Sequence, residues 1–463
     1  MTDQAQVLGD AIRTAATTRF VRVAPSALAA LPDAVRVAGD RPPMIVADQN
    51  TMAAAGRDAL SLLEQAGFLT EAPVILEGKP RLKPNAQVAR DMANAIKARG
   101  VIPVSVGSGV VNDLTKYAAE LAGVAYVSVP TAASMDGYAA SGAALLDNGF
   151  KRTLACAPPV SIVADLDVIA RAPPRMAGWG YGDLAGKIVA GADWTLADAL
   201  GEEPLNREPF ALVQENVRAW LSKPADIGRA DPAALGDLMD GLLVSGFAMQ
   251  AHGNSRPASG AEHLISHVWE MEGLTHRGEP AAHGACVGIG TVAILALYEW
   301  FLAQDIDDEV VRRAAGRTAS PDSIEAEIAA AFPNQAIAES ARIEMREKLG
   351  QATRRAERLS TLRATWPSLR EELRRFCVSP GEVEGWLREA GAPTHPEDLG
   401  VPLQTLAAEY RRARLIRRRF TILDLLDDLG WLDRGVVALF AEGGFWGRRS
   451  REGERPAASA QGC

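Results

Sequence analysis

Short apolar runs alternate with helix-forming stretches over residues 44–164, and this alternation constrains the fold more than any other feature of the sequence. A short continuous apolar run is typical of a strand that is buried on both faces. Strands that alternate with helices predict a parallel sheet that is covered by helices. We expect five such strands, at residues 44–47, 73–76, 102–106, 125–129 and 161–164.

The alternation ends at Ala172-Pro173-Pro174, and beyond this break the sequence has a helical pattern almost throughout. A chain of 463 residues is also too long for one ordinary core. We therefore predict an α/β domain over residues 1–172 and an all-α domain over residues 173–445. The polar residues 446–463, rich in Pro and Ala, are predicted to form a disordered tail.

Composition excludes several classes of partner. The 49 basic and 58 acidic residues give a net charge of −9, which argues against nucleic acid or an anionic membrane. The N-terminal residues show no signal peptide, and the apolar run 285–297 is shorter than the roughly 20 residues of a membrane span. We expect this run to be a buried central helix. The four cysteines are far apart, which favours a reduced, cytoplasmic setting.

Histidines are concentrated in one segment of a chain that has only six of them. His263 and His267 are four residues apart in a helical stretch, so both project from one face. His283 follows a loop and opens a second helix, and two crossing helices can bring it to the first pair. Two imidazoles and one carboxylate form the usual ligand set of a catalytic divalent metal. The alternative is that these histidines are unrelated core or capping residues, and the spacing leaves open whether His263 or His267 is the ligand.

Asp183 is our candidate for the carboxylate of that metal site. It lies near the start of a helical stretch, four residues before Lys187. The alternative interpretation is that Asp183 offsets the helix dipole and pairs with Lys187 on one helix face.

A glycine turn, Gly107-Ser108-Gly109, follows the strand predicted at residues 102–106 and precedes a helix. Backbone N–H groups at such a turn can bind a pyrophosphate, although a simple tight turn has the same pattern. Asp48 ends an earlier strand and is a candidate for a ribose hydroxyl or, alternatively, a surface turn. The loop 130–143 follows another strand and has Asp136 as its charged group, at the edge where α/β sheets bind ligands.

Five blocks of sequence resemble the sn-glycerol-1-phosphate dehydrogenases, within the superfamily of dehydroquinate synthase-like and iron-dependent alcohol dehydrogenases. The blocks are GSGVVNDLTK (107–116), PTAASMDGYA (130–139), GYGDLAGK (180–187), SRPASGAEHLISHVWEM with the later HGACVGIG (255–271 and 283–290), and RFTILDLLDDLGWL (419–432). The resemblance implies a dinucleotide-binding α/β domain for NAD or NADP, an all-α metal- and substrate-binding domain, and a cleft between them.

The resemblance also assigns residues. It implies that the metal ligands are Asp183, His263 and His283, which selects His263 over His267. It places the cofactor contacts on Gly107, Ser108, Gly109, Asn112, Asp113, Thr131, Ala132, Ala133 and Ser134. It places the substrate contacts on Asp136, Asp183 and His267, of which we take Asp136 and His267 as catalytic.

The implied reaction is the reversible, metal-dependent reduction of dihydroxyacetone phosphate to sn-glycerol 1-phosphate. A zinc, nickel or iron ion would polarise the ketone, the nicotinamide would supply hydride, and His267 would supply the proton. Lys187 and Arg256 are our candidates for binding the substrate phosphate. We expect a homo-oligomer whose substrate is a small molecule.

The sequence departs from the family at two places. Ala140, with Ser141 beside it, stands where the family usually has Ser or Thr next to the nicotinamide. His283 lies a few residues later than in archaeal members, which resembles the bacterial branch. Three alternatives stay open: a dehydrogenase of another polyol or ketone, a cyclase, and a catalytically silent nucleotide-binding relative. The blocks 130–139 and 259–267 argue against the cyclase, and the intact ligand set argues against the silent relative.

Overall fold

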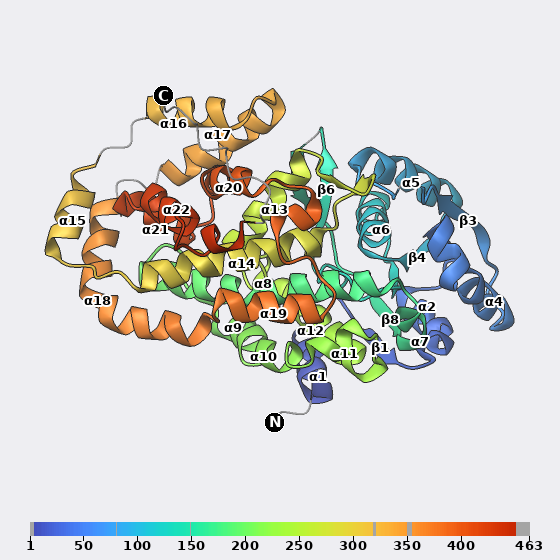
Figure 1. The fold of residues 1–463 in the computed structure, drawn as a ribbon. Coiled ribbons are helices and arrows are strands. Elements are labelled where there is room, and N and C mark those ends of the chain that lie inside the picture. The colour runs from blue at the N-terminus through green and yellow to red at the C-terminus, as the bar shows by residue number, and fades with distance from the viewer. Residues whose placement is uncertain (1–3, 80, 149, 318–320, 350–353, 451–463) are drawn as a thin grey trace, which may run out of the picture.

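A computed structural model describes residues 4–79, 81–148, 150–317, 321–349 and 354–450. A sheet with its helices forms one side of the molecule, on the right in Figure 1, and a larger helical region forms the other. The chain passes from the first to the second at α8 (Pro174–Ala199), directly after the predicted break.

Six parallel strands form the sheet, in the order β1-β8-β5-β4-β2-β3. Their bounds are β1 (Phe20–Ala24), β2 (Pro43–Asp48), β3 (Glu71–Leu76), β4 (Ile102–Gly107), β5 (Val127–Pro130) and β8 (Ser161–Asp165). All five expected strands are present. The sequence analysis missed β1, because Arg22 interrupts its short apolar pattern at a half-buried edge of the sheet.

Helices cover both faces of the sheet, as continuous apolar strands predict. Alternate residues of β2 show this directly: Ile45 and Ala47 pack with α2 (Leu31–Ala38) and α4 (Arg57–Gln65). Met44 and Val46 pack with α5 (Ala86–Arg99) and α6 (Gly109–Ala122) on the opposite face. A hairpin of β6 (Ala143–Asp147) and β7 (Phe150–Leu154) extends from this half toward the helical region.

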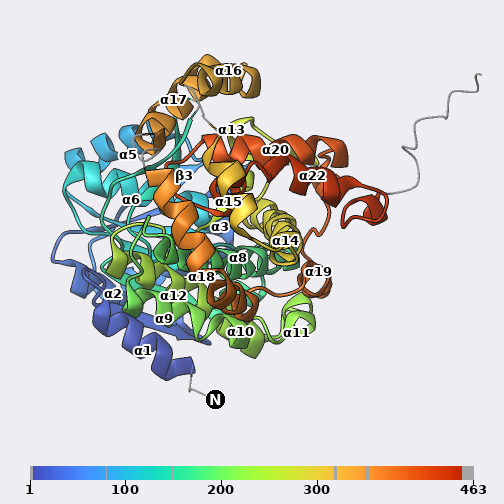
Figure 2. The same cartoon turned by 90° about the vertical axis from the view of Figure 1, so that its left-hand side faces the viewer.

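The remaining elements are mainly helices. After α8 they are α9 (Arg207–Gln214), α10 (Val217–Trp220), α11 (Pro224–Gly228), α12 (Pro232–His252), α13 (Ala261–Met271), α14 (His283–Leu302), α15 (Asp308–Ala315), α16 (Pro321–Ala331), α17 (Gln335–Leu349), α18 (Arg355–Phe376), α19 (Pro380–Glu389), α20 (Leu403–Leu415), α21 (Ile422–Leu429) and α22 (Leu432–Phe440). Short elements complete the fold: α1 (Gln4–Thr14), α3 (Gln49–Thr51), α7 (Leu166–Ala170), the pair β9 (Thr275–His276) and β10 (Glu279–Pro280), and single helical turns at Ala27–Ala30, Met52–Gly56, Pro396–Leu399 and Gly447–Arg449. In both Figure 1 and Figure 2, α16 and α17 lie at one end of the molecule, and both contact α20.

The apolar helix α14 lies at the centre of the helical region, where it packs on α8 and α13. It is the one helix among the described residues that is long and apolar enough to cross a membrane, yet 89% of its apolar window is buried inside the protein. This arrangement agrees with the buried central helix expected from the sequence.

Both ends of the described chain pack against the helical region. Val7 and Ala11 of α1 are buried in the same core as the helices, and α1 contacts α12. Trp446 is also buried, and its indole N–H donates a hydrogen bond of 3.0 Å to the Tyr410 hydroxyl. The tail predicted from residue 446 therefore starts too early, because folded structure continues to Arg449. The rest of that tail, residues 451–463, lies outside the described residues.

Candidate active site

The three predicted metal ligands lie on three different helices. Asp183 is in the middle of α8, His263 is in the first turn of α13, and His283 is the first residue of α14. Ligand atoms of the three residues all lie within 4.8 Å of one another. Asp183 and His263 are buried and His283 is half-buried. Two imidazoles and a carboxylate at this spacing fit one divalent cation that keeps a coordination position for substrate.

Glycines let α14 approach α8 and α13 closely enough to bring these ligands together. A Cβ atom at Gly284 of α14 would overlap the carbonyl oxygen of Trp179 in α8. A Cβ atom at Gly182 would overlap the Gly284 carbonyl, and one at Gly290 would overlap the backbone of α13. Backbone meets backbone at both helix crossings, so no larger residue fits without separating the helices.

Two glutamates orient the imidazoles of His263 and His283. Nδ1 of His263 lies 2.6 Å from Glu262 Oε1, and Nδ1 of His283 lies 2.6 Å from Glu270 Oε1. A carboxylate that accepts the Nδ1–H selects the tautomer whose Nε2 lone pair is available to a cation. Burial raises the pKa of Glu270, but the Lys151 ammonium paired with it outweighs this effect and holds the pKa well below its usual range.

These glutamates and Lys151 are not among the site residues predicted from the sequence. Glu262 directly precedes one ligand, and Glu270 is one helical turn after the neighbouring His267. A search for carboxylates within a turn of each histidine would have found both. Lys151 comes from β7, 119 residues before Glu270, and carries no local signal of this role.

A second group of possible ligands shares one histidine with the first: His267, Glu270 and His283. In this group Glu270 already accepts a hydrogen bond from His283 and forms an ion pair with Lys151. Asp183, in contrast, has its Oδ1 3.4 Å from Nε2 of His263, the ring nitrogen that faces away from the glutamate partner. The group that contains Asp183 is therefore the better candidate for the metal.

Lys187 is enclosed between two carboxylates. Its Nζ lies 2.9 Å from Asp183 Oδ1 and 2.8 Å from Asp136 Oδ2. The Asp136 backbone N–H also donates to Asp183 Oδ2 at 2.9 Å. Burial raises the pKa of Asp183, but the Lys187 charge and the nearby histidines outweigh it and hold the pKa well below its usual range. Lys187 thus fixes two carboxylates, which differs from the phosphate contact that the sequence predicts for it.

Arg256 is also placed away from the predicted phosphate contact. Its side chain is fully buried, and its guanidinium donates to the carbonyl oxygens of Asp193 at 2.9 Å and Phe420 at 3.2 Å. It also forms an ion pair of 3.1 Å with Glu203. These contacts tie the segment before α13 to the start of α21, so Arg256 has a structural position.

A cavity of about 290 Å³ lies between the carboxyl ends of the strands and the helical region. The start of α6 contributes Ser108 and Gly109, and the ligand helices contribute His263 and His283. Asp136, from the loop after β5, also lines the cavity. A cleft is therefore present between the two parts of the chain, and two of the three candidate metal ligands, His263 and His283, line it.

Known proteins similar to this chain include dehydrogenases of one family. Over 392 residues the chain is 30% identical to the NAD(P)+ glycerol-1-phosphate dehydrogenase of Bacillus subtilis (strain 168), covering 83% of this chain and 85% of the relative. The chain belongs to the glycerol-1-phosphate dehydrogenase family. The Methanosarcina acetivorans enzyme of the same name is 32% identical over 284 residues, covering 61% of this chain and 76% of the relative.

The wider family and the fold agree with this membership. Residues 22–173 match the family described as iron-containing alcohol dehydrogenase. The fold is similar to glycerol dehydrogenase from Schizosaccharomyces pombe, with a TM-score of 0.57, 16% identity, and coverage of 91% of this chain and 90% of that one. An NADH-dependent butanol dehydrogenase from Thermotoga maritima gives a TM-score of 0.57 at 15% identity, covering 91% and 97%. The resemblance and the fold class inferred from the sequence are both confirmed.

The cofactor contacts that the family implies fall into two groups in this chain. Four of them line the cavity: Ser108, Gly109, Asp113 and Ser134. The others lie outside its lining: Gly107, Asn112, Thr131, Ala132 and Ala133. Asn112, for example, faces the sheet, and its Oδ1 accepts a hydrogen bond of 2.9 Å from Ser128. Ala140 and Ser141, at the place where this chain departs from the family, both line the cavity.

Asp48 caps the short helix α3 at the end of β2. Its carboxylate accepts the Thr51 backbone N–H at 2.8 Å, and its own N–H donates to Thr51 Oγ1 at 3.0 Å. These hydrogen bonds are the ones expected of an Asp in a turn, which is one of the two alternatives that the sequence leaves open. A contact with the ribose stays a prediction.

His267 lines the same cavity beside the family's ligands. Its ring centroid lies 6.1 Å from that of His263 and 6.0 Å from that of His283. Burial, followed by the charges of Arg417 and Lys151, holds the pKa of His267 well below its usual range, so the imidazole is neutral. Its Nδ1 is buried and has no hydrogen-bond partner within the described part of the chain.

Proposed function

We propose that this protein catalyses the reversible reduction of dihydroxyacetone phosphate to sn-glycerol 1-phosphate, with NADH or NADPH and one divalent metal ion. The observation that carries the proposal is that ligand atoms of Asp183, His263 and His283 lie within 4.8 Å of one another, beside a cavity that His263, His283 and the glycine turn of α6 line. The bacterial and archaeal relatives, which are glycerol-1-phosphate dehydrogenases, support the choice of substrate.

Asp183, His263 and His283 would hold the metal, and the turn at Ser108 and Gly109 would hold the cofactor pyrophosphate. When bound, the cation polarises a ketone carbonyl and the reduced nicotinamide supplies hydride. Zinc, nickel and ferrous iron all accept two imidazoles and a carboxylate, so the donor set supports each of them.

The loop that carries Asp136 is held rigidly against α8, where substrate would bind. Lys187 bridges Asp136 and Asp183, and Ser245 Oγ donates to the same Asp136 oxygen at 3.2 Å. Lys116 donates to the carbonyl oxygens of Gly137 at 2.7 Å and of residue 142 at 3.0 Å. Fixed polar groups of this kind orient a small substrate and so reduce the entropy that is lost when the substrate reaches its reactive geometry.

His267 is the residue that we propose for proton transfer. It is neutral, it lies one helical turn from His263, and its Nδ1 has no partner among the described residues. In the oxidation direction a neutral imidazole can accept the proton of the alcohol hydroxyl, directly or through one water, and in the reduction direction the imidazolium returns that proton to the alkoxide. Asp136 and Asp183 are proposed to bind the substrate hydroxyl groups.

The proposal is tested by following oxidation of NADH and of NADPH with dihydroxyacetone phosphate and, separately, with dihydroxyacetone. The assay is repeated after chelation and after zinc, nickel or iron has been restored. We expect activity on the phosphorylated ketone that chelation abolishes and metal restores, with sn-glycerol 1-phosphate as the product in a stereospecific assay. Activity on dihydroxyacetone alone would support the alternative of a polyol dehydrogenase, and bound cofactor without turnover on any ketone would support a silent relative.

Two further expectations remain part of the proposal. The homo-oligomer predicted from the sequence is tested by light scattering of the purified protein. A cytoplasmic location is tested by fractionation of the cells that produce it.

A further inference from the structure

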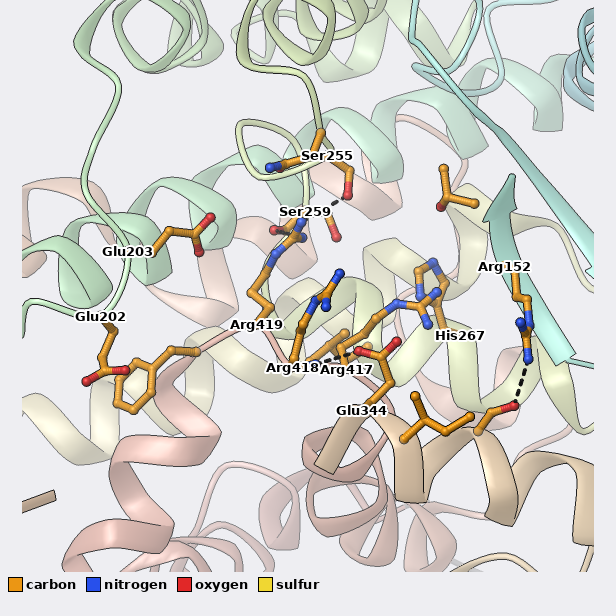
Figure 3. A pocket seen from close by; sticks show the side chains of 16 residues that line it. Arg152, Glu202, Glu203, Ser255, Ser259, His267, Glu344, Arg417, Arg418 and Arg419 are labelled. Atoms are coloured by element: carbon orange, nitrogen blue, oxygen red, sulfur yellow. Dashed lines mark hydrogen bonds between the residues drawn. The ribbon is translucent and has the colours of Figure 1, made fainter. Parts of the chain in front are cut away.

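A second cavity, of about 530 Å³, adjoins the metal cleft at His267 (Figure 3). It is bounded by β7, α13, α17, the loop before α13 and residues 417–420. Four residues line both cavities: Thr153, Ser255, Ser259 and His267. A ligand could therefore extend from the metal ligands past His267 into the second cavity.

Arginines dominate the charge of this second cavity. Its cationic residues are Arg152, Arg417, Arg418 and Arg419, and its acidic residues are Glu202, Glu203 and Glu344. Two of the acids pair with cations outside the lining, since Glu202 binds Arg354 and Arg358. Glu203 binds Arg256 at 3.1 Å. The third acid, Glu344, accepts the Arg418 backbone N–H, and its charge acts on Arg417. The four arginines of the lining still outnumber its three acids, so the lining has an excess of positive charge.

Arg419 is a half-buried cation whose described hydrogen bonds end on uncharged oxygens. It donates to the Ser259 carbonyl at 2.6 Å and to Ser255 Oγ at 3.0 Å. Burial, followed by the nearby Arg256 charge, lowers the pKa of Arg419 to about 10. A guanidinium that is desolvated beside a second cation binds an anion strongly. The anion offsets both the lost hydration of the guanidinium and its repulsion by the second cation.

Arg417 approaches the same space from the side of the metal cleft. Figure 3 shows its guanidinium directed toward His267, and its charge contributes to the lowered pKa of that histidine. Arg417 also donates to the Lys151 carbonyl oxygen at 3.2 Å, which fixes its direction next to β7. The unpartnered Nδ1 of His267 is thus close to both the arginine wall and the metal ligands.

We propose that Arg419 and Arg417, with the hydroxyl groups of Ser255 and Ser259, form the subsite that binds the phosphate of the substrate. The inference rests on the proposed function and replaces the phosphate contacts that the sequence predicts at Lys187 and Arg256. With its carbonyl at the metal ligands, a triose phosphate would pass His267 and place its phosphate against two guanidinium groups. Arginine forks match phosphate oxygens in two-point hydrogen bonds, which gives both affinity and orientation.

The position of the glycine turn argues that this phosphate belongs to the substrate and not to the cofactor. Ser108 and Gly109 line the first cavity and not the second. A cofactor pyrophosphate bound at that turn would lie at the start of α6, whereas Arg417 and Arg419 lie between α20 and α21 in the helical region.

The test compares Arg419→Gln and Arg417→Gln with the matched control Arg418→Gln in the metal-loaded enzyme. Arg418 lines the same cavity but is exposed and paired with Glu347. We expect kcat/KM for dihydroxyacetone phosphate to fall roughly 100-fold in each of the first two variants, and by less than about threefold in the control. The preference for dihydroxyacetone phosphate over dihydroxyacetone, which has no phosphate, should fall at least tenfold in the first two variants and stay within about threefold of wild type in the control.

Inorganic phosphate provides a second readout that does not depend on turnover of each variant. It should inhibit the wild-type enzyme competitively against dihydroxyacetone phosphate and should bind more weakly to the Arg417 and Arg419 variants in calorimetry. Should Arg419→Gln fail to fold, Arg419→Lys keeps the charge, loses the fork, and is expected to give an intermediate loss.

Equal losses on both ketones, loss confined to NADPH, or unchanged kinetics in both arginine variants would overturn the subsite. Failure of the proposed function has a different signature, because the wild-type enzyme itself would then not reduce dihydroxyacetone phosphate. A wild-type enzyme that is active on the phosphorylated ketone, with variants that keep this preference, contradicts the subsite alone.

Discussion

The glycines at the cofactor turn and the glycines at the metal centre serve different purposes. At Gly109, a Cβ atom would meet only the flexible Met135 side chain, at 2.9 Å from its Cε. At Gly284 and Gly182, a Cβ atom would overlap backbone of a neighbouring helix. The turn in the sheet half is therefore set by local chain geometry, whereas the candidate metal ligands come together because three helices touch through their backbones.

This contrast predicts where the protein is sensitive to change. Substitution of Gly109 should weaken cofactor binding and leave the fold intact. Substitutions at the helix crossings should disturb stability and metal binding together, because the same contacts determine both.

Removing the ligand on α8 should have the largest effect. Asp183→Asn takes away a carboxylate that faces both His263 and Lys187. We expect loss of bound metal and a fall in kcat/KM of roughly a thousandfold or more, because stabilisation of several kcal/mol by the cation is lost. Metal analysis and steady-state kinetics measure the two effects, and full metal content in this variant would show that the ligand set is wrong.

Separating the helices at their crossing should have the next largest effect. Gly284→Ala is expected to lower the free energy of unfolding by about 3 kcal/mol and to weaken metal binding, because a Cβ atom overlaps the Trp179 carbonyl. Gly385→Ala in α19 is the control, since nothing lies within 4 Å of its Cβ position. It should stabilise the protein by about 0.5 kcal/mol or more. Denaturant unfolding measures both, and equal stabilities would remove the distinction between the two kinds of glycine.

Changing the partner of a ligand should have a smaller effect than changing the ligand. Glu270→Gln keeps the shape but loses the charge that His283 and Lys151 share. We expect metal affinity to fall roughly 10- to 100-fold with the fold retained. Glu262→Gln, the equivalent change at His263, should give a loss in the same range. Competition with a metal indicator measures both affinities, and values equal to wild type would mean that the glutamates do not orient the ligands.

The glycine turn should give the smallest effect. Gly109→Ala is expected to raise the KM for the cofactor roughly tenfold, because a methyl group stands where the pyrophosphate approaches the backbone. Metal content should match wild type and the unfolding free energy should stay within about 1 kcal/mol of it, since Met135 can move. A loss of metal in this variant would show that the turn and the metal centre are not independent.

The sheet could be predicted from the sequence because its signals are local. Apolar runs bounded by turns indicated five strands, and Ser108 of the predicted glycine turn directly precedes α6. The strand β1 was missed because Arg22 breaks its pattern and its partner β8 is distant in sequence. Local periodicity says nothing about such a partner.

The metal ligands could be selected in part from the sequence, since four-residue spacing puts His263 and His267 on one face. Choosing between them needed the family resemblance, because helix periodicity treats the two alike. The roles of Lys187 and Arg256 could not be predicted, since burial decides whether a cation meets substrate or an internal carboxylate. Lys151 is 119 residues before Glu270 in the sequence, so their ion pair can be recognised only from the three-dimensional structure.

Metal content per chain in three alanine variants tests the central claim most directly. Wild type and His267→Ala should each retain one equivalent of metal after purification without chelator. His263→Ala and His283→Ala should retain none, because each removes one of two imidazole ligands. Loss of metal from His267→Ala, with metal retained in His263→Ala, would place the ion on His267, Glu270 and His283 and contradict a centre built on Asp183, His263 and His283.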